Sequence, residues 1–131
     1  MSNVKIGSVV LQSDSIDVVR SLCQQYGIHP SKKLGQNFLV DANIVRMMVE
    51  HANLDANDIV VEVGPGFGVL TQEIAKRAKR VVGVELDHKV FHAAQDILVP
   101  YNNIDLVQGD ILKIPNYDLL CIPSNCRDRD N

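Results

Sequence analysis

Three glycines separate a run of β-branched residues from a segment with helical spacing. The stretch VVEVGPGFGVLTQEIA contains Gly64, Gly66 and Gly68. Glycine permits a tight turn and lets the backbone approach a ligand closely. The helix expected behind the loop presents unpaired backbone N–H groups at its start. Such a loop could therefore bind a nucleotide-like ligand, although a glycine-rich loop alone can also be only a structural turn.

A carboxylate follows this loop at the distance expected of a ribose-binding residue. Glu85 ends a second β-branched run, RVVGVE, 21 positions after Gly64. A carboxylate at that strand end can accept hydrogen bonds from both hydroxyls of a ribose. A solvated strand end is the alternative, but the paired spacing favours a nucleoside-containing cofactor. Two kinds of cofactor remain open at this point, a dinucleotide and S-adenosylmethionine.

Two details favour S-adenosylmethionine. The glycine spacing is GxGxG, without the GxGxxG that suits a pyrophosphate, and Glu62 precedes the loop to give ExGxGxG. Further on, Asp110 follows a third strand and could accept a hydrogen bond from an adenine amino group, although a cap or turn role explains it as well. A nicotinamide-dependent oxidoreductase remains a competing hypothesis, which tight NADH binding without S-adenosylmethionine binding would favour.

The elements that must position these residues alternate between strands and helices. Runs of β-branched and other apolar residues predict strands at 59–63, 80–86, 104–108 and 117–122. Apolar residues at helical spacing predict helices at about 16–26, from Asp41 onward, from about 70 to 78, and at about 87–98. This order is typical of right-handed βαβ units, and it predicts an α/β fold with a parallel sheet.

The composition indicates one ordered domain with no overall electrostatic case for nucleic acid. The chain has 131 residues, 46% of them apolar, and a formal net charge of −3. RNA contacts must therefore come from a local patch, for which His29, Lys32 and Lys33 are candidates. The three cysteines form no CxxC, as expected of reduced thiols in the cytoplasm. We expect no membrane span, no targeting segment and no metal site, since the pair His88 and His92 lacks the HExxH glutamate.

Four segments together resemble the small-subunit ribosomal RNA adenine N6,N6-dimethyltransferases. They are KKLGQNFLVD, VVEVGPGFGVLT, VVGVELD and VQGDIL, in that order, and LGQNFL is the most specific of them. The resemblance covers about residues 17–125. It implies a Rossmann-like S-adenosylmethionine-dependent methyltransferase fold. It also implies transfer of two methyl groups from S-adenosylmethionine to the exocyclic amine of each of two adjacent adenines near the 3′ end of small-subunit ribosomal RNA, on a 30S-type particle.

The resemblance further implies which residues contact the cofactor. They are Asn37, Leu39, Gly64, Gly66, Glu85, Asp110 and Asn125. Among them Glu85 would hold the ribose and Asp110 the adenine amine, while Asn37 and Leu39 would reach the cofactor from the N-terminal segment. Phe67, beside the glycines, is expected to line the pocket.

Asn125 is the expected catalytic residue. The family places Asn-[Leu/Ile]-Pro-[Tyr/Phe] after the fourth strand. There the asparagine and the proline carbonyl accept from the target amine, and the aromatic ring stacks on the extruded base. Ser124-Asn125 matches the opening of this motif, but Cys126-Arg127-Asp128 stands where Leu-Pro-Tyr would be.

The lost motif implies a C-terminally truncated form, weakly active or inactive. The expected parts are an N-terminal helix with a cofactor- or RNA-contacting segment at 1–40, a partial cofactor-binding domain at 41–125, and a tail at 126–131 that is not family sequence. The strand at 117–122 would become an apolar edge through which copies of the chain could associate. The alternative function is a non-catalytic module in ribosome biogenesis that binds S-adenosylmethionine or ribosomal RNA.

Overall fold

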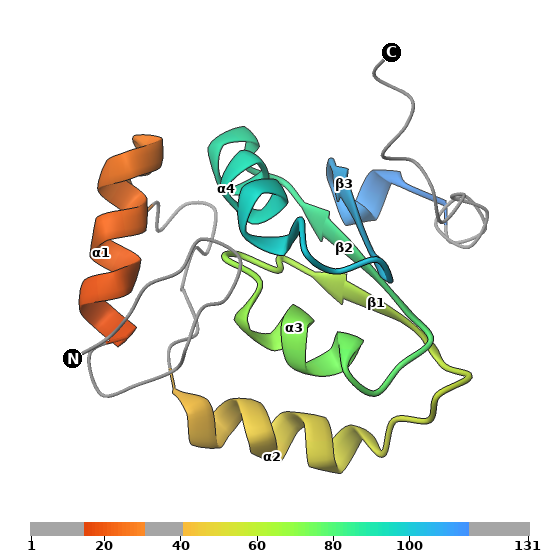
Figure 1. Cartoon of the computed structure of the whole chain (residues 1–131). Coiled ribbons are helices and arrows are strands. Elements are labelled where there is room, and N and C mark those ends of the chain that lie inside the picture. Colours follow the sequence, from red (N-terminus) through yellow and green to blue (C-terminus); the bar gives the residue numbers. More distant parts are fainter. Residues whose placement is uncertain (1–14, 31–40, 116–131) are drawn as a thin grey trace.

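The computed structural model describes residues 15–30 and 41–115, and Figure 1 shows their arrangement. The helices are α1 (Ser15–Tyr26), α2 (Ala42–Ala52), α3 (Val69–Ala75) and α4 (His88–Leu98), followed by the short 3-10 helix η2 (Ile111–Lys113). The strands are β1 (Ile59–Val63), β2 (Arg80–Glu85) and β3 (Ile104–Gln108). The expected strand at 117–122 lies outside the described residues.

The three strands form a parallel sheet in the order β1-β2-β3. Val61 pairs with Val82, and Val82 pairs with Asp105. The predicted parallel α/β fold is therefore confirmed, with strand bounds that differ from the sequence prediction by at most one residue. Because all three strands point the same way, their carboxyl ends lie along one edge of the sheet.

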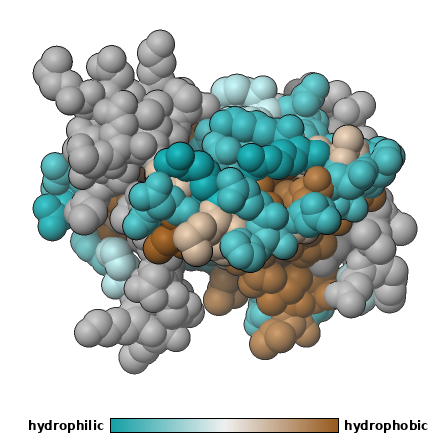
Figure 2. Space-filling view, turned by 90° about the horizontal axis from the view of Figure 1, so that it is seen from below, coloured by the Kyte–Doolittle hydropathy of each residue, from teal (hydrophilic) through white to brown (hydrophobic). Residues whose placement is uncertain are grey.

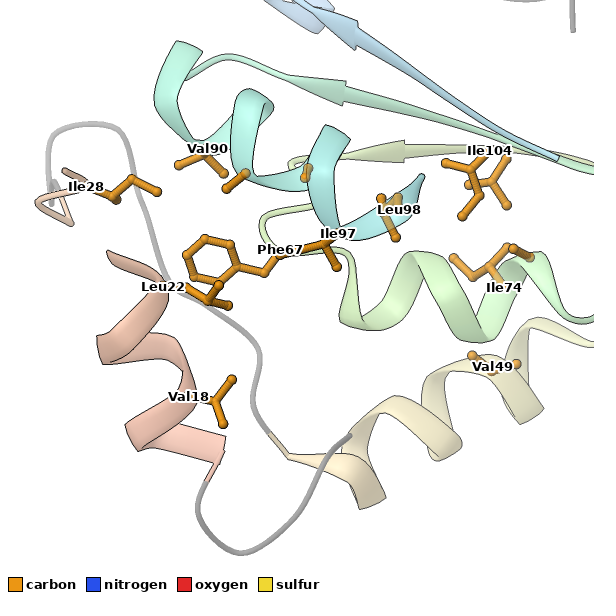
Figure 3. Close-up of a cluster of buried hydrophobic side chains, with 14 of the residues drawn as sticks. Val18, Leu22, Ile28, Val49, Phe67, Ile74, Val90, Ile97, Leu98 and Ile104 are labelled. Atoms are coloured by element: carbon orange, nitrogen blue, oxygen red, sulfur yellow. The ribbon is translucent and has the colours of Figure 1, made fainter. Parts of the chain in front are cut away.

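Helices α3 and α4 cover the same face of this sheet (Figure 1). Each crossover is right-handed and each new strand is added on the same side of the previous one, so both connecting helices must lie on one face. Figure 3 shows the core that results between this face and the helices. The core contains Val18, Leu22, Phe67, Ile74, Val81, Val90, Ile97, Leu98 and Ile104.

Helix α1 is held against α4 by apolar and polar contacts. Val18 and Leu22 are buried in the shared core, and the hydroxyl of Tyr26 donates to Asp96 Oδ2 at 2.7 Å. Burial and this bond to a carboxylate raise the pKa of Tyr26 to about 12. Tyr26 therefore stays protonated, and remains a donor to Asp96, over the whole physiological range of pH.

Helix α2 begins where the sequence predicts and buries a narrow apolar face. Asp41 accepts from Asn43 N at 2.8 Å and so acts as the N-cap. Val45 and Val49 are buried, whereas Ile44 and Met48 are 45% and 46% exposed. The packing of α2 therefore buries only one residue per turn.

Helix α3 ends at Ala75, earlier than predicted. Lys76 is its C-cap, and Glu73 pairs with Lys76 at 2.6 Å. Arg80 starts β2 and donates to Asp105 Oδ2 at 2.6 Å. Both side chains of that ion pair are nearly buried. The pair connects β2 to β3 near the amino ends of the strands, at the end of the sheet opposite the glycine loop.

The other face of the sheet carries apolar side chains that helices α3 and α4 do not cover. Val82 and Val84 are buried there against Val107 and the η2 segment. The side chains of β1 on this face, Ile59, Val61 and Val63, are 43%, 39% and 62% exposed. In the view from below, hydrophobic residues gather beside a band of hydrophilic ones (Figure 2). Among the described residues, β1 pairs only with β2.

None of the helices in residues 15–30 and 41–115 has the length and apolar character needed to cross a membrane.

Candidate cofactor site

The glycine loop crosses the carboxyl edge of the sheet in a conformation that favours glycine. Gly64, Gly66 and Gly68 all have positive φ, of 70°, 59° and 81°. A Cβ added at Gly68 would lie 2.7 Å from a Leu98 side-chain carbon, so this glycine is needed for packing. A Cβ added at Gly64 would meet nothing within 4 Å. The backbone at Gly64 therefore faces open space, where a ligand can approach it.

Glu85 ends β2 directly beside this loop, as the sequence predicts. Its carboxylate accepts from Gly66 N at 3.3 Å and from Asp87 N at 3.1 Å. The residue is only 7% exposed. Each carboxylate oxygen can accept more than one hydrogen bond, so these contacts orient Glu85 without using all its acceptor capacity. The structure thus brings Gly66 and Glu85 into one site, with Gly64 on the same loop.

Pro65 rests on β2 because Gly83 leaves room for it. A Cβ added at Gly83 would lie 3.1 Å from Pro65 Cγ and 2.9 Å from a Leu106 methyl carbon. The contact between Pro65 and Gly83 was not predicted from the sequence. The available signal was a glycine inside a strand, which often marks a close approach by another part of the chain.

Phe67 does not line the cofactor pocket, so that expectation is wrong. Its side chain is 3% exposed and points into the core toward Leu22 and Ile97 (Figure 3). Because it lies between Gly66 and Gly68 in the sequence, its burial anchors the glycine loop from beneath. A large apolar residue between two glycines can either pack into the core or line a ligand pocket. The periodicity of the sequence does not distinguish these two roles.

Glu62 and Thr71 hold the other end of the loop. Thr71 lies in α3 and is fully buried, and its hydroxyl donates to Glu62 Oε1 at 2.5 Å. Burial raises the pKa of Glu62 from 4.5 to about 7; the bond from Thr71 lowers it and the charge of Glu85 raises it further. The first residue of ExGxGxG therefore joins β1 to α3 across the loop. Thr71 was not predicted from the sequence as the partner of Glu62.

We expect Glu62 to make the stability of the chain depend on pH. Below pH 4.5 its carboxyl is protonated in both states and has no effect. As the pH rises toward about 7 the unfolded chain loses this proton first, so the free energy of unfolding falls. Glu62→Gln keeps an acceptor for Thr71 but cannot ionise. Between about pH 5 and pH 8, the free energy of unfolding should fall by about 2 kcal/mol more in the parent chain than in the variant.

Urea unfolding at a series of pH values measures this difference. Glu73→Gln is the matched control, since Glu73 is on the surface of α3 and pairs only with Lys76 among the described residues. Its profile should follow the parent chain. If the free energy of unfolding changes equally with pH in Glu62→Gln and in the parent chain, the prediction is wrong. The carboxyl of Glu62 would then have the same pKa in the folded and unfolded chain.

Asp110 lies at the same edge of the sheet. The backbone of the preceding residue ties the end of β3 to β2, since Gly109 N donates to Glu85 O at 2.8 Å. Asp110 Oδ1 accepts from Leu112 N at 2.9 Å and caps η2. The capping role is therefore observed. The carboxylate of Asp110 is partly exposed, just beyond the end of β3.

The residues present at this edge fit S-adenosylmethionine. Gly64 leaves open space over the backbone, Glu85 offers a fixed carboxylate, and Leu86 next to it is an apolar side chain left 46% exposed. The expected contacts Asn37, Leu39 and Asn125 lie outside the described residues. Within residues 15–30 and 41–115, no three histidine, cysteine, aspartate or glutamate side chains gather in a way that could hold a metal ion.

Sequence comparison relates the chain to enzymes that modify ribosomal RNA. The family model described as ribosomal RNA adenine dimethylase matches residues 29–125. The ribosomal RNA small subunit methyltransferase A of Lysinibacillus sphaericus is 47% identical over 94 residues, which are 72% of this chain and 32% of that protein. The protein of the same name from Leuconostoc citreum is 39% identical, over 78% of this chain and 36% of its own length. The chain thus spans about a third of the length of the curated relatives it matches.

Solved structures agree with this relation. The 23S rRNA methyltransferase ErmE matches with a TM-score of 0.57 and 36% identity, covering 60% of this chain and 32% of that one. A dimethyladenosine transferase from Plasmodium falciparum matches with a TM-score of 0.57 and 27% identity, covering 60% and 30%. The fold is that of S-adenosylmethionine-dependent methyltransferases, and the chain belongs to the ribosomal RNA adenine dimethylase family.

Proposed function

We propose that this chain binds S-adenosylmethionine at the glycine loop and Glu85, as the cofactor-binding part of a ribosomal RNA adenine N6,N6-dimethyltransferase. One observation carries the proposal. The buried Glu85 carboxylate is fixed by Gly66 N and Asp87 N at the edge of a parallel sheet, next to a Gly64 backbone that faces open space. This geometry offers acceptors for ribose hydroxyls together with close backbone approach. Family membership favours S-adenosylmethionine over a nicotinamide dinucleotide.

The other assigned contacts are part of the same proposal. Asn37 and Leu39 would contact the cofactor from the segment 1–40, and Asp110 would accept from the adenine amine at the end of β3. Gly64, Gly66, Glu85 and Asp110 would belong to a cofactor-binding unit that extends over residues 41–125. Residues 126–131 would lie outside it.

The proposed reaction methylates two adjacent adenines near the 3′ end of small-subunit ribosomal RNA. The cofactor supplies a methyl group on a sulfonium, which is already a good leaving group. The task of the protein is then to orient the adenine amine, whose lone pair is delocalised into its ring. Asn125 would accept from one N–H of that amine and so aim the lone pair at the methyl carbon.

This chain offers only part of that arrangement. Cys126-Arg127-Asp128 follows Asn125, without the proline and the aromatic residue of the family motif. No stacking ring would then hold the extruded base, so we propose that turnover is weak or absent. The second candidate function, a module that binds S-adenosylmethionine or ribosomal RNA without transferring a methyl group, follows from the same departure.

Two measurements test the proposal in order. Calorimetric titration with S-adenosylhomocysteine should show one site, and NADH should not compete for it. A folded chain that fails to bind S-adenosylhomocysteine would contradict the cofactor assignment. A methyl-transfer assay with unmethylated small ribosomal subunits then separates the two functions, because any turnover rules out the non-catalytic module.

The proposed setting is the cytoplasm, on small-subunit ribosomal RNA in a 30S-type particle. A further part of the proposal is that copies of the chain associate through the apolar strand expected at 117–122. Among the described residues, the exposed side chains of Ile59, Val61 and Val63 add a separate apolar surface on β1. Sedimentation analysis over a range of concentrations tests it, and a monomer throughout would contradict it.

A further inference from the structure

Two acidic side chains on neighbouring strands point to the same face of the sheet, close to the glycine loop. Glu62 on β1 lies opposite Gly83 on β2, and Glu85 is two residues beyond Gly83 on the same strand. Side chains two residues apart on a strand point to the same face. That face is the one covered by α3, because Thr71 of α3 bonds Glu62. The two carboxylates therefore lie on one face of two adjacent strands, at the end nearest the loop.

Neither carboxylate has a cationic partner in the part of the chain that the structure describes. The ion pairs found within residues 15–30 and 41–115 include neither Glu62 nor Glu85. Glu85 accepts only from backbone groups, Gly66 N and Asp87 N. Asp87 and Asp110 cap α4 and η2 at the same edge of the sheet, and both are themselves acidic. A ligand on the glycine loop therefore meets negative charge that no described ion pair balances.

The cations of the elements packed against β1 and β2 have other partners. On β2, Arg80 pairs with Asp105 at the opposite end of the strand. On α4, Lys89 Nζ donates to a backbone carbonyl at the end of α1. On α3, Glu73 pairs with Lys76. The other charged or titratable side chains of α2 and α4 are exposed, namely Arg46, Glu50, His51, His88, His92 and Asp96.

Glu62 is the member of this pair that changes its protonation near neutral pH. Burial raises its pKa from 4.5 to about 7; the bond from Thr71 lowers the pKa and the charge of Glu85 raises it. Because the charge of Glu85 acts on Glu62, a charge bound beside Glu85 would act on it too. A positive charge favours the ionised carboxylate, so a bound cation would lower the pKa of Glu62.

The cofactor and its product differ in charge at one atom. S-adenosylmethionine carries a positive sulfonium, whereas S-adenosylhomocysteine, which has lost the methyl group, carries a neutral thioether. Gly64, whose backbone faces open space, is only two residues beyond Glu62. A ligand held by this loop and by Glu85 would therefore lie within the field of both carboxylates, and only one of the two ligands would respond to it through its sulfur.

We propose that Glu62 makes this site select the charged cofactor over its neutral product. In this role Glu62 releases its proton to the solvent when S-adenosylmethionine binds, and takes one up when S-adenosylhomocysteine takes its place. The inference rests on the proposed function and adds a regulation by pH to it. Below about pH 6 most of the carboxyl is neutral, so the cation binds at the expense of a proton. As the pH rises to about 8, Glu62 is already ionised and the preference for the cation reaches its full value.

Glu62→Gln tests this role, because glutamine keeps an acceptor for Thr71 but cannot ionise. Calorimetric titrations at about pH 6 and about pH 8 give the dissociation constants of both ligands, and their ratio measures the preference for S-adenosylmethionine. If the cation lowers the pKa of Glu62 by about 0.5 to 1, this preference should rise about 2- to 5-fold more in the parent chain than in Glu62→Gln. The amino group of the ligands titrates near pH 8 as well, but it does so with both chains and cancels in the comparison. Glu73→Gln is the matched control and should follow the parent chain.

The proton can also be counted in the parent chain without any variant. Calorimetry at about pH 7, in buffers with different enthalpies of ionisation, measures the protons released on binding. S-adenosylmethionine should release about 0.2 to 0.3 of a proton more than S-adenosylhomocysteine, because Glu62 is about half ionised at this pH and its pKa falls only when the cation binds.

Two results would overturn the inference. One is a preference that changes equally with pH in the parent chain and in Glu62→Gln, and the other is equal proton release by the two ligands. In both cases S-adenosylhomocysteine still binds, so the proposed cofactor site is retained and only the role of Glu62 is lost. A folded chain that binds neither ligand contradicts the proposed function and the inference together.

Discussion

Replacing Glu85 with alanine is expected to weaken the binding of S-adenosylhomocysteine by at least about 100-fold. The carboxylate would accept two hydrogen bonds from the ribose, and bonds to a charged group contribute about 1.5–3 kcal/mol each. The substitution also removes the acceptor of Gly66 N and Asp87 N, so the glycine loop loses its tie to β2. Calorimetry on both proteins measures the ratio of the dissociation constants.

Two further variants separate the ribose contact from the tie to the loop. Glu85→Gln keeps one acceptor oxygen for the loop and should lose only about tenfold in affinity. Glu73→Ala removes a surface carboxylate of α3 and should bind like the parent chain. Circular dichroism establishes that each variant is folded. A folded Glu85→Ala chain with parental affinity would mean that the ribose lies elsewhere.

Phe67→Ala is expected to lower the free energy of unfolding by about 3–5 kcal/mol. The ring is 3% exposed and packs between α1 and α4, so its removal leaves a cavity at the point where the glycine loop meets the core. Such a loss is a large fraction of the stability of a small domain. Urea unfolding followed by circular dichroism measures it, and where the variant is unfolded in water the loss exceeds the stability of the parent chain.

Phe91→Ala is the matched control for this prediction. Phe91 lies on α4 and is only partly buried, so the same truncation there should cost about 1 kcal/mol. Similar losses for Phe67→Ala and Phe91→Ala would contradict the anchoring role of Phe67. Phe67→Leu should recover most of the stability, because leucine keeps most of the buried apolar surface.

The strands and the centre of the site could be predicted because local signals determine them. The run IVVEV is bounded by Asp58 and Gly64 and forms β1 over the predicted residues. Parallel strands place their carboxyl ends at one edge, so the spacing predicted that the glycine loop and Glu85 would lie at the same edge of the sheet. Asp110 follows by the same argument. Each of these predictions needs only the direction of the strands and the position of a residue at a strand end.

The remaining features depend on contacts that no local pattern contains. The burial of Phe67 depends on where α1 packs, and the bond from Thr71 to Glu62 depends on how α3 lies on β1. The exposure of Met48 depends on which elements reach α2. The pairing of Arg80 with Asp105 depends on β2 and β3 lying side by side, although the two residues are far apart in the sequence. The assigned roles of Asn37, Leu39 and Asn125 stay predictions.

The sheet with helices on one face has a consequence for synthesis on the ribosome. The elements that pack together in space also follow one another along the chain, in the order β1, α3, β2, α4 and β3. Each element can therefore dock as soon as it leaves the exit tunnel. In a relative with the same elements, β1 would be formed before the later segments are translated. Its exposed valines would then be available for those segments to pack against. Folding from the N-terminal end would then follow from the order of the strands alone.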